Sequence, residues 1–338
     1  MNSQLGESVC VDLGTNLIKV VVTNRKGVIT QTVAAPNNLG FNVPLKPNQV
    51  ETLSSLLKNV FSEHKLPKKN LRIAMPEHYV STQVIEIPTL TDAELASSVR
   101  WQAQQYIPIP KEELSLNYQV LYRPEKKNLA IQNMRVLLVG INQNHLNSLV
   151  TAYTKADLET SVLETESIAL LRNLPTVSED SACVLVNFGA NQMDLTIVRG
   201  GELAMVISHQ AGSTMITKAL MNAFNLPLDK AEEYKRSCGF DAQQLDGKIA
   251  NAIVPVAQIL ISNIKNTISF YNDKNSLQAI NQIYTCGGGT LIPGFNQLLA
   301  ANLNLPVEPL AVFTGLTGAI PEADQAMFAV ATGLAKRK

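Results

Sequence analysis

Two glycine turns, about half the chain apart, have the residue types and spacing to bind a polyphosphate. The first follows the apolar run 8–11 and turns at Gly14; the second follows 183–186 and turns at Gly189. Because glycine allows close approach of the backbone, successive N–H groups at such a turn form an anion-binding concavity. Either turn alone is typical of an ordinary hairpin. Two matched turns facing each other across a cleft would hold a triphosphate from both sides.

A third glycine site follows another strand-like run, 283–286, and consists of Gly287, Gly288 and Gly289. The pattern predicts a buried strand, a glycine turn and then a helix that includes residues 297–299. Consecutive glycines at a strand end permit flat, close contact with a ligand ring or sugar. A tight strand-to-helix crossover explains them equally well, so both interpretations stay open.

The turns must be positioned by regular elements, and the hydrophobic pattern predicts a mixed α/β chain. A capping box of Thr91 and Glu94 predicts a helix that ends near Gln105. Further helices are predicted over 50–61 and, as one long buried helix, over 249–271. Strands are predicted at 71–75, 79–87, 116–122 and 134–141.

Composition limits the class of protein. The 338 residues exceed what one hydrophobic core usually holds, which predicts two or more lobes. A formal net charge of zero gives no field that would attract nucleic acid or acidic membranes. No apolar run is long enough to span a bilayer and residues 1–11 lack a signal-peptide pattern, so we expect a soluble, cytoplasmic chain. The basic end 336–338 is expected to be a solvated tail. The four cysteines and the isolated histidines show no metal-binding spacing.

These motifs resemble those of the actin-like ATPases. Residues 12–19 resemble the first phosphate loop of that superfamily, 187–191 the second, and 287–289 the adenosine motif. Within it, the segment 74–141 and the ending 328–335 are similar to the PilM family of type IV pilus proteins, which is related to FtsA. Unlike FtsA, the protein is therefore not expected to have an amphipathic membrane-targeting helix.

The resemblance implies a duplicated, two-lobe α/β fold of the actin-like (ribonuclease H-like) kind with a small inserted α+β subdomain. It implies a first lobe over residues 1–170, with the insertion at about 75–142, and a second lobe over 171–338.

The resemblance also implies ATP and Mg²⁺ as ligands. Asp12 corresponds to the acidic residue that holds Mg²⁺, and Glu166 to the residue that orients the attacking water. The residues implied to contact ATP lie in the two loops, two helix starts and the glycine triplet: Gly14, Thr15, Asn16, Leu17, Lys19, Asn187, Gly189, Ala190, Asn191, Gly212, Ser213, Glu232, Lys235, Gly287, Gly288, Gly289 and Leu291.

Several of these roles have a plain structural alternative. Asp12 could order a turn, Lys19 could be an exposed strand lysine, and Glu166 could cap a helix. Asn187 departs from the family's usual aspartate and lacks its charge, so the chain is expected to be at most a slow ATPase.

Helix starts carry the remaining implied contacts. Residues 212–214 are expected to open a helix whose N–H groups suit an anion. Asp229 and Glu232 form a capping pattern for the next helix. Glu232 and Lys235 are implied to contact ribose and adenine, with a surface ion pair as the alternative.

For function, the resemblance implies a cytoplasmic scaffold that binds the N-terminal cytoplasmic tail of PilN and so lies at the inner membrane through a partner. The pilus motor ATPase and platform protein are further implied partners, and a weak homo-oligomer stays open. The segment 79–106 is expected to help line the tail groove, with Trp101 either an anchor or a core residue. Two other classes stay open: a small-molecule kinase of the same fold, and a filament-forming relative.

Overall fold

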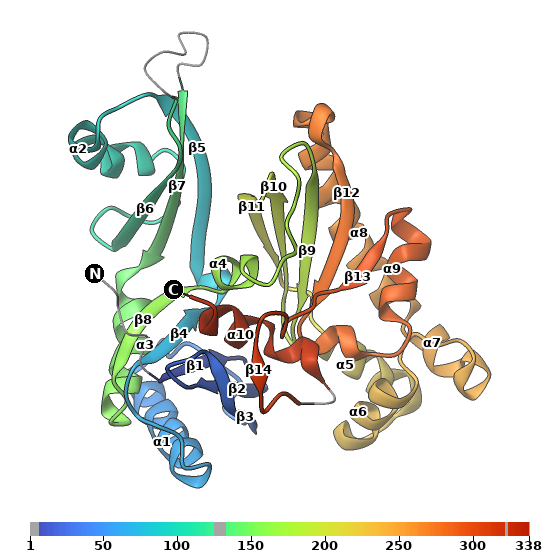
Figure 1. Cartoon of the computed structure of the whole chain (residues 1–338). Helices are drawn as coiled ribbons and strands as arrows, with labels where there is room; N and C mark the ends of the chain where they lie inside the picture. The colour runs from blue at the N-terminus through green and yellow to red at the C-terminus, as the bar shows by residue number, and fades with distance from the viewer. Residues whose placement is uncertain (1–6, 125–132, 322–323, 338) are drawn as a thin grey trace.

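A computed structural model describes residues 7–124, 133–321 and 324–337 (Figure 1). It contains a six-stranded, a five-stranded and a three-stranded sheet. Residues 1–6, part of the start that lacks a signal pattern, and Lys338 of the basic end lie outside the described residues.

The first lobe is built on the six-stranded sheet, ordered β14-β3-β2-β1-β4-β8. Its strands are β1 (Ser8–Leu13), β2 (Leu17–Thr23), β3 (Val28–Pro36), β4 (Leu71–Met75), β8 (Thr160–Thr165) and β14 (Thr317–Gly318). The helices α1 (Pro47–Glu63) and α3 (Gln143–Lys155) cover one face and share a core with β1 and β2, in which Val20, Leu57 and Tyr153 are buried. The predicted helix over 50–61 and strand at 71–75 are confirmed.

The second lobe repeats this pattern on the five-stranded sheet, ordered β11-β10-β9-β12-β13. In each lobe three sequential strands pair antiparallel, and the first of them also pairs parallel with a later strand. The strands are β9 (Ala182–Phe188), β10 (Met193–Arg199), β11 (Glu202–His209), β12 (Ile280–Cys286) and β13 (Val307–Pro309). The helices are α5 (Thr214–Phe224), α6 (Leu228–Ser237), α7 (Lys248–Ala252), α8 (Val254–Lys274) and α9 (Phe295–Leu303).

The predicted single helix over 249–271 is wrong, because the chain bends by 64° between α7 and α8. Pro255 lies in the first turn of α8, and Ile253 before it leaves the helical region (φ −105°, ψ 6°). Proline has no N–H to donate and its ring clashes with the preceding turn, which explains the break.

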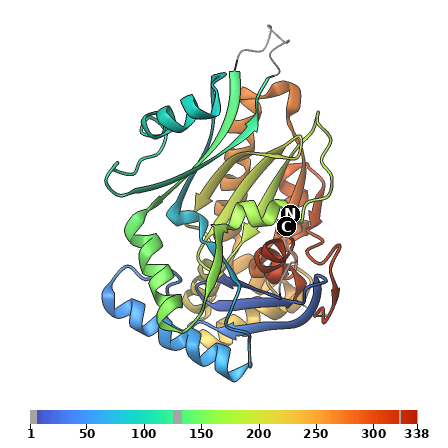
Figure 2. The same cartoon turned by 60° about the vertical axis from the view of Figure 1, so that its left-hand side comes forward.

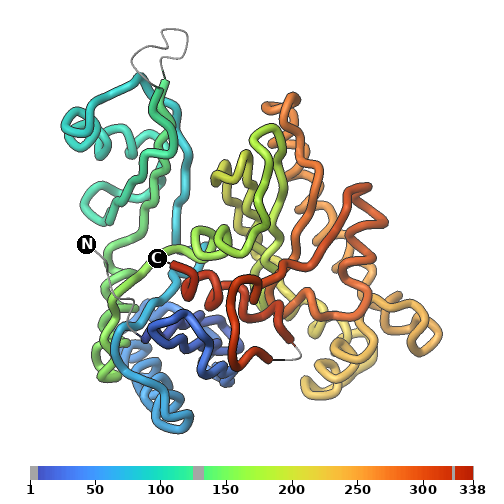
Figure 3. The backbone as a smooth tube through the Cα atoms, viewed as in Figure 1, coloured from blue at the N-terminus to red at the C-terminus, as the bar shows by residue number. Residues whose placement is uncertain are grey.

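The inserted subdomain leaves the first lobe after β4 and rejoins it at α3 (Figure 3). Its antiparallel sheet is ordered β5-β7-β6, with β5 (Val80–Pro88), β6 (Leu114–Tyr122) and β7 (Asn133–Asn142). The helix α2 (Asp92–Ala103) packs on that sheet and begins with the predicted capping box, in which Thr91 and Glu94 bond reciprocally. One ion pair joins the subdomain to the second lobe, between Arg135 of β7 and Glu202 of β11 at 2.9 Å.

Two short helices lie side by side between the two large sheets, α4 (Glu166–Leu171), which leads from β8 to β9, and α10 (Ala329–Ala335), which packs on α4 and on β1 (Figures 1 and 2). Arg72 of β4 donates to the carbonyl oxygens of Leu334 (3.0 Å) and Arg337 (2.7 Å) at the end of α10. These otherwise unsatisfied carbonyls thereby gain a charged partner. Short 3₁₀ turns complete the fold: η1 (Glu77–Tyr79), η2 (Gln244–Gly247), η3 (Ser276–Gln278), η4 (Gly288–Leu291) and η5 (Gln325–Phe328).

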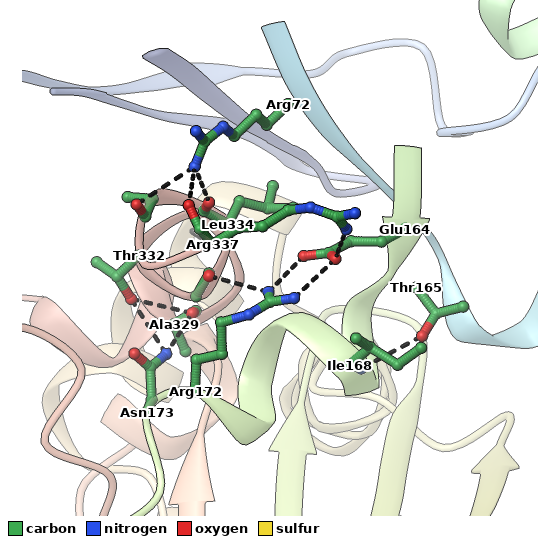
Figure 4. Close-up of polar contacts among 12 residues, drawn as sticks. Arg72, Glu164, Thr165, Ile168, Arg172, Asn173, Ala329, Thr332, Leu334 and Arg337 are labelled. Carbon is green, nitrogen blue, oxygen red and sulfur yellow. Dashed lines mark hydrogen bonds and ion pairs between the residues drawn. The ribbon is translucent and has the colours of Figure 1, made fainter. Parts of the chain in front are cut away.

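The basic end is not a solvated tail where it is described. The Lys336 ammonium donates to Asn173 Oδ1 at 2.6 Å, and burial lowers the pKa of Lys336 to about 8. Arg337 pairs with the buried carboxylate of Glu164, which also accepts two bonds from Arg172 (Figure 4). Buried charges are retained where they are paired in this way, so residues 336–337 are anchored to β8 and to the segment that follows α4.

Among the described residues, no single helix has the length and apolar composition of a membrane span. Only the bent pair Gln244–Ala252 and Val254–Lys274 would meet those two criteria together.

Candidate functional site

The first hairpin places a carboxylate and an ammonium at its base. Asp12 of β1 lies opposite Lys19 of β2 in the strand register, and Lys19 Nζ is 2.7 Å from Asp12 Oδ2. Asp12 is only 3% exposed, so the ion pair is largely shielded from solvent. Lys19 is therefore not an exposed strand lysine. The tip is closed by a bond from Gly14 N–H to the Leu17 carbonyl at 3.0 Å.

The tip of that hairpin consists of Thr15 and Asn16, and Asn16 is exposed. A Cβ on Gly14 would lie 2.9 Å from the Leu17 carbonyl oxygen. That distance is shorter than atoms of this kind approach, so the turn requires glycine here.

The second hairpin has the same backbone and different side chains. Asn187 of β9 lies opposite Asp194 of β10, and Gly189 N–H donates to the Gln192 carbonyl at 2.8 Å. The carboxylate thus stands on the returning strand, where the first hairpin has its lysine. Ala190 and Asn191 form the tip.

The second hairpin rests on the start of α5. Ser213 N–H donates to the Gly189 carbonyl at 3.0 Å, and Thr214 N–H to the Ala190 carbonyl at 2.8 Å. A Cβ on Gly212 would lie 2.2 Å from the Ala190 oxygen, so only glycine allows this approach. These N–H groups already have acceptors. The helix start therefore gives the loop a rigid support rather than the free donors that the sequence suggested.

Charged groups of both hairpins act on one carboxyl group at the start of the interlobe helix α4. Glu166, the first residue of α4, is partly buried, and its pKa is raised by loss of hydration and by the charges of Asp12, Asp194 and Glu77. Lys19 acts in the opposite direction. The charges of both hairpins thus act on the same carboxyl group. The structure brings Asp12, Lys19, Glu166 and the second hairpin together.

The carboxyl groups here are crowded and retain protons unusually well. Burial raises the pKa of Asp194 to about 6, although Ser208 donates a hydrogen bond to it. Burial and the charge of Asp194 raise the pKa of Glu77 to about 7. A bound cation would relieve this repulsion.

Carboxylate oxygens are the ligands that Mg²⁺ prefers, so these residues fit that ion. No group of three or more His, Cys, Asp or Glu side chains in 7–124, 133–321 and 324–337 is placed to hold a metal ion by itself. Mg²⁺ usually keeps several waters and binds through one or two carboxylates plus substrate phosphates. Asp12 is the residue that would hold it here.

The glycine triplet divides into two roles. A Cβ on Gly287 would lie 2.6 Å from Asn187 Oδ1, and one on Gly289 would lie 2.5 Å from the Phe188 ring. These two glycines serve the strand-to-helix crossover. Gly288 has only one atom within 4 Å of its Cβ position, at 3.9 Å, and Leu291 in the same turn is exposed. Gly288 and Leu291 are therefore the members that a ligand could contact.

Glu232 and Lys235 of α6 do not form a surface ion pair. Lys235 is 6% exposed and its ammonium donates to Glu232 Oε1 at 2.6 Å and to Thr217 Oγ1 of α5 at 2.9 Å. Burial opposes ionisation of Glu232, yet its bonds to Lys235 and Thr217 lower its pKa. The predicted capping pattern is wrong, because α6 begins at Leu228 after Pro227 with no side-chain cap.

Two carboxylates of this site, Asp194 and Glu77, were absent from the sequence predictions. Asp194 could have been found by aligning the two glycine turns, because it occupies in the second hairpin the position that Lys19 occupies in the first. Glu77 had no comparable signal, because its side chain reaches the site through the turn η1 rather than along a strand.

Known proteins match the whole described arrangement. A family model described as "Type IV pilus assembly protein PilM" matches residues 10–338. A solved "PilM-PilN type IV pilus biogenesis complex" contains a chain that is 24% identical, with 98% of each chain covered and a TM-score of 0.84.

Two further structures share the fold. The ethanolamine utilization protein EutJ from Carboxydothermus hydrogenoformans is 16% identical over 97% of this chain and 89% of that one, with a TM-score of 0.59. MreB5 of Spiroplasma citri bound to ADP is 13% identical over 98% and 95%, with a TM-score of 0.55. These likenesses confirm the predicted two-lobe, actin-like fold class. From the family match over nearly its whole length, the chain belongs to the PilM family of type IV pilus assembly proteins.

Proposed function

We propose that this chain is a nucleotide-responsive scaffold of the type IV pilus machine. It binds Mg·ATP between its two lobes and the N-terminal cytoplasmic tail of PilN beside its inserted subdomain. In this way it lies in the cytoplasm at the inner membrane and connects membrane components with the motor ATPase and platform protein.

One observation carries the nucleotide half of the proposal. Two hairpins with the same register and the same glycine turn, one from each lobe, act on the same carboxyl group, Glu166. Their tips offer backbone N–H groups at Thr15, Asn16, Ala190 and Asn191, the donors that a polyphosphate needs. The MreB5 structures, which share this fold, are described as bound to ADP and to AMPPNP.

A titration with a fluorescent ATP analogue tests this half. We expect Mg²⁺-dependent binding, weakened about tenfold or more in Asp12→Asn, because the variant loses the charge that holds the cation. Asp92→Asn is the matched control, since Asp92 is an exposed aspartate paired with Arg123 in the inserted subdomain. An affinity that does not depend on Mg²⁺, or an equal loss of affinity in both variants, would refute the nucleotide site.

The partner half rests on the inserted subdomain. The subdomain has its own sheet and core, and its helix α2 presents Trp101 with 64% of its surface exposed. Trp101 is therefore not a core residue, and the interpretation as simple core packing is wrong. Tyr106 just beyond α2 is also exposed, at 42%. Exposed aromatic residues of this kind are frequent binding anchors, and an extended tail would add backbone hydrogen bonds.

The same-fold structure described as a PilM–PilN complex supports the choice of partner. Titration with a synthetic PilN N-terminal peptide tests it. We expect Trp101→Ala to weaken binding about tenfold or more, while Phe270→Ala, an exposed aromatic on α8 of the second lobe, has no effect. Equal affinities of the wild type and Trp101→Ala would remove Trp101 from the groove.

Hydrolysis is proposed to be slow, because Asn187 has no charge with which to order metal or water. Family membership favours the scaffold over the small-molecule kinase. Sedimentation with and without Mg·ATP separates the scaffold from a filament-forming protein, which alone would pellet when nucleotide is added.

A further inference from the structure

A buried chain of hydrogen bonds passes from the inserted subdomain to the second lobe. Ser167 N–H of α4 donates to the Glu77 carboxylate at 3.2 Å. Thr82 of β5 donates to the other Glu77 oxygen at 3.4 Å, and Thr196 of β10 donates to Ser167 Oγ at 3.0 Å. The chain thus connects β5, η1, α4 and β10.

Every member of this chain is buried: Glu77 is 2% exposed, Ser167 and Thr196 are 1% exposed, and Thr82 is 7% exposed. In such an environment a polar group without a partner is costly, and satisfied networks hold one arrangement rigidly. The network therefore fixes the relative positions of four elements.

The chain touches the candidate site at two points. Ser167 directly follows Glu166 in the first turn of α4, and Thr196 lies on the same strand and the same face as Asp194. The Thr165 side chain satisfies the Ile168 N–H, and Glu77 satisfies that of Ser167. A short helix of six residues depends on such caps, because most of its N–H groups lack partners within the helix.

The turn η1, which joins the first lobe to the inserted subdomain, thus reaches α4 through Glu77.

We propose that Glu77 is a positioning residue, which holds the first turn of α4 through Ser167 and thereby places the Glu166 carboxyl group between the two phosphate hairpins. This inference rests on the proposed nucleotide site and adds a link to it. Because Glu77 also bonds to β5, a movement of the inserted sheet is transmitted to Glu166.

The first test needs no nucleotide. Hydrogen–deuterium exchange at the Ser167 amide is compared between the wild type, Glu77→Ala and Glu77→Gln. We expect exchange about tenfold or more faster in Glu77→Ala and near wild-type exchange in Glu77→Gln, since glutamine still offers an acceptor oxygen. Asn173→Ala is the matched control, because Asn173 makes buried bonds at the other end of α4. Wild-type exchange in Glu77→Ala would overturn the proposal.

The second test asks whether Glu77 acts through Glu166. The dissociation constant of Mg·ATP is measured for Glu77→Ala, Glu166→Gln and the double variant. We expect each single change to shift it about threefold or more, and the double variant to shift it no further than the larger single change. Multiplicative shifts would overturn the proposal. A purely structural role of Glu77 would leave Glu166→Gln equally effective in both backgrounds.

If Glu77→Ala does not fold, Glu77→Asp replaces it in both tests, because the shorter side chain keeps the charge and withdraws the acceptor from Ser167. A wild-type protein that binds no Mg·ATP would refute the proposed function. The exchange measurement would still decide whether Glu77 holds the first turn of α4.

Discussion

The two glycine hairpins, one from each lobe, have the same backbone register and different side-chain arrangements. Each closes its turn with a bond from the glycine N–H to the residue three positions on, Leu17 in one and Gln192 in the other. The first carries the ion pair of Asp12 and Lys19, and the second an amide, Asn187, opposite the carboxylate of Asp194.

This difference separates two tasks. Backbone N–H groups and glycines, which would contact phosphate in the proposed site, are present in both hairpins. The charged groups, which would organise metal and water there, differ. Only the first hairpin provides a cation, and the second adds a negative charge to a site that already contains Asp12 and Glu166. The lobes are therefore alike in how they would grip a polyphosphate and unlike in what they would do to it.

Breaking the ion pair of the first hairpin should have the largest effect. Lys19→Met leaves Asp12 buried and unpaired beside other carboxylates, so we expect the free energy of unfolding to fall by about 3–5 kcal/mol. Urea denaturation measures this. Lys58→Met is the control, because the pair of Lys58 with Asp157 is exposed. Similar losses of unfolding free energy in both variants would show that burial of the Asp12–Lys19 pair does not increase its contribution to stability.

The support of the second hairpin comes next. Gly212→Ala forces a Cβ into the Ala190 carbonyl, and we expect a loss of about 2–3 kcal/mol together with weaker nucleotide binding. The control Gly288→Ala meets no atom closer than 3.9 Å and should change stability little. A wild-type melting temperature for Gly212→Ala would mean that the hairpin does not rest tightly on α5.

Removing the carboxylate of the second hairpin should raise the free energy of unfolding, whereas Lys19→Met should lower it. The folded protein holds a proton on Asp194 up to about pH 6, whereas the unfolded chain loses it near its ordinary pKa of 3.8. Wild-type stability therefore falls as pH rises through this window. Asp194→Asn cannot lose stability in this way. We therefore expect the free energy of unfolding of Asp194→Asn, relative to that of the wild type, to increase by about 1–2 kcal/mol between about pH 5 and about pH 8.

Denaturation at the two pH values measures this advantage. Asp157→Asn, at an exposed position, serves as the control. An advantage of Asp194→Asn that shrinks as pH rises would contradict the raised pKa.

The smallest effect is expected from making the hairpins more alike. Asn187→Asp introduces the aspartate expected at this position from the resemblance to actin-like ATPases, but it adds a charge beside Asp194. The variant should therefore be slightly less stable without Mg²⁺ and recover when Mg·ATP is added. Phosphate release should rise about threefold if the new carboxylate helps to order metal or water. An unchanged rate would show that Asn187 does not limit hydrolysis.

Much of this architecture was predictable from sequence, because glycine spacing and hydrophobic period are local signals. The hairpins, the capping box at Thr91 and the strands of the insertion followed from them. The break before α8 also had a local signal in Pro255, which the strong helical period of its neighbours obscured.

What the sequence did not predict depends on contacts between distant segments. The two-residue strand β14 joins the first sheet through pairing with β3, and no periodicity can show so short an element. Lys336 and Arg337 look like solvent-facing charges until Asn173 and Glu164 are placed beside them. In the sequence, Glu77 is simply a polar residue that follows a strand. Its role becomes visible only in the folded chain, where it accepts a hydrogen bond from Ser167 of α4.

The two helices packed between the lobes, α4 and α10, limit how the lobes can move. Asn173, just after α4, donates to the Ala329 carbonyl and to Thr332 of α10, so the two helices are joined to each other. Bodies joined by two adjacent connections rotate about the line through them and cannot slide apart. We therefore expect any opening and closing of the lobes to be a rotation about this line, with Glu166, the first residue of α4, near the axis and the hairpin tips moving furthest.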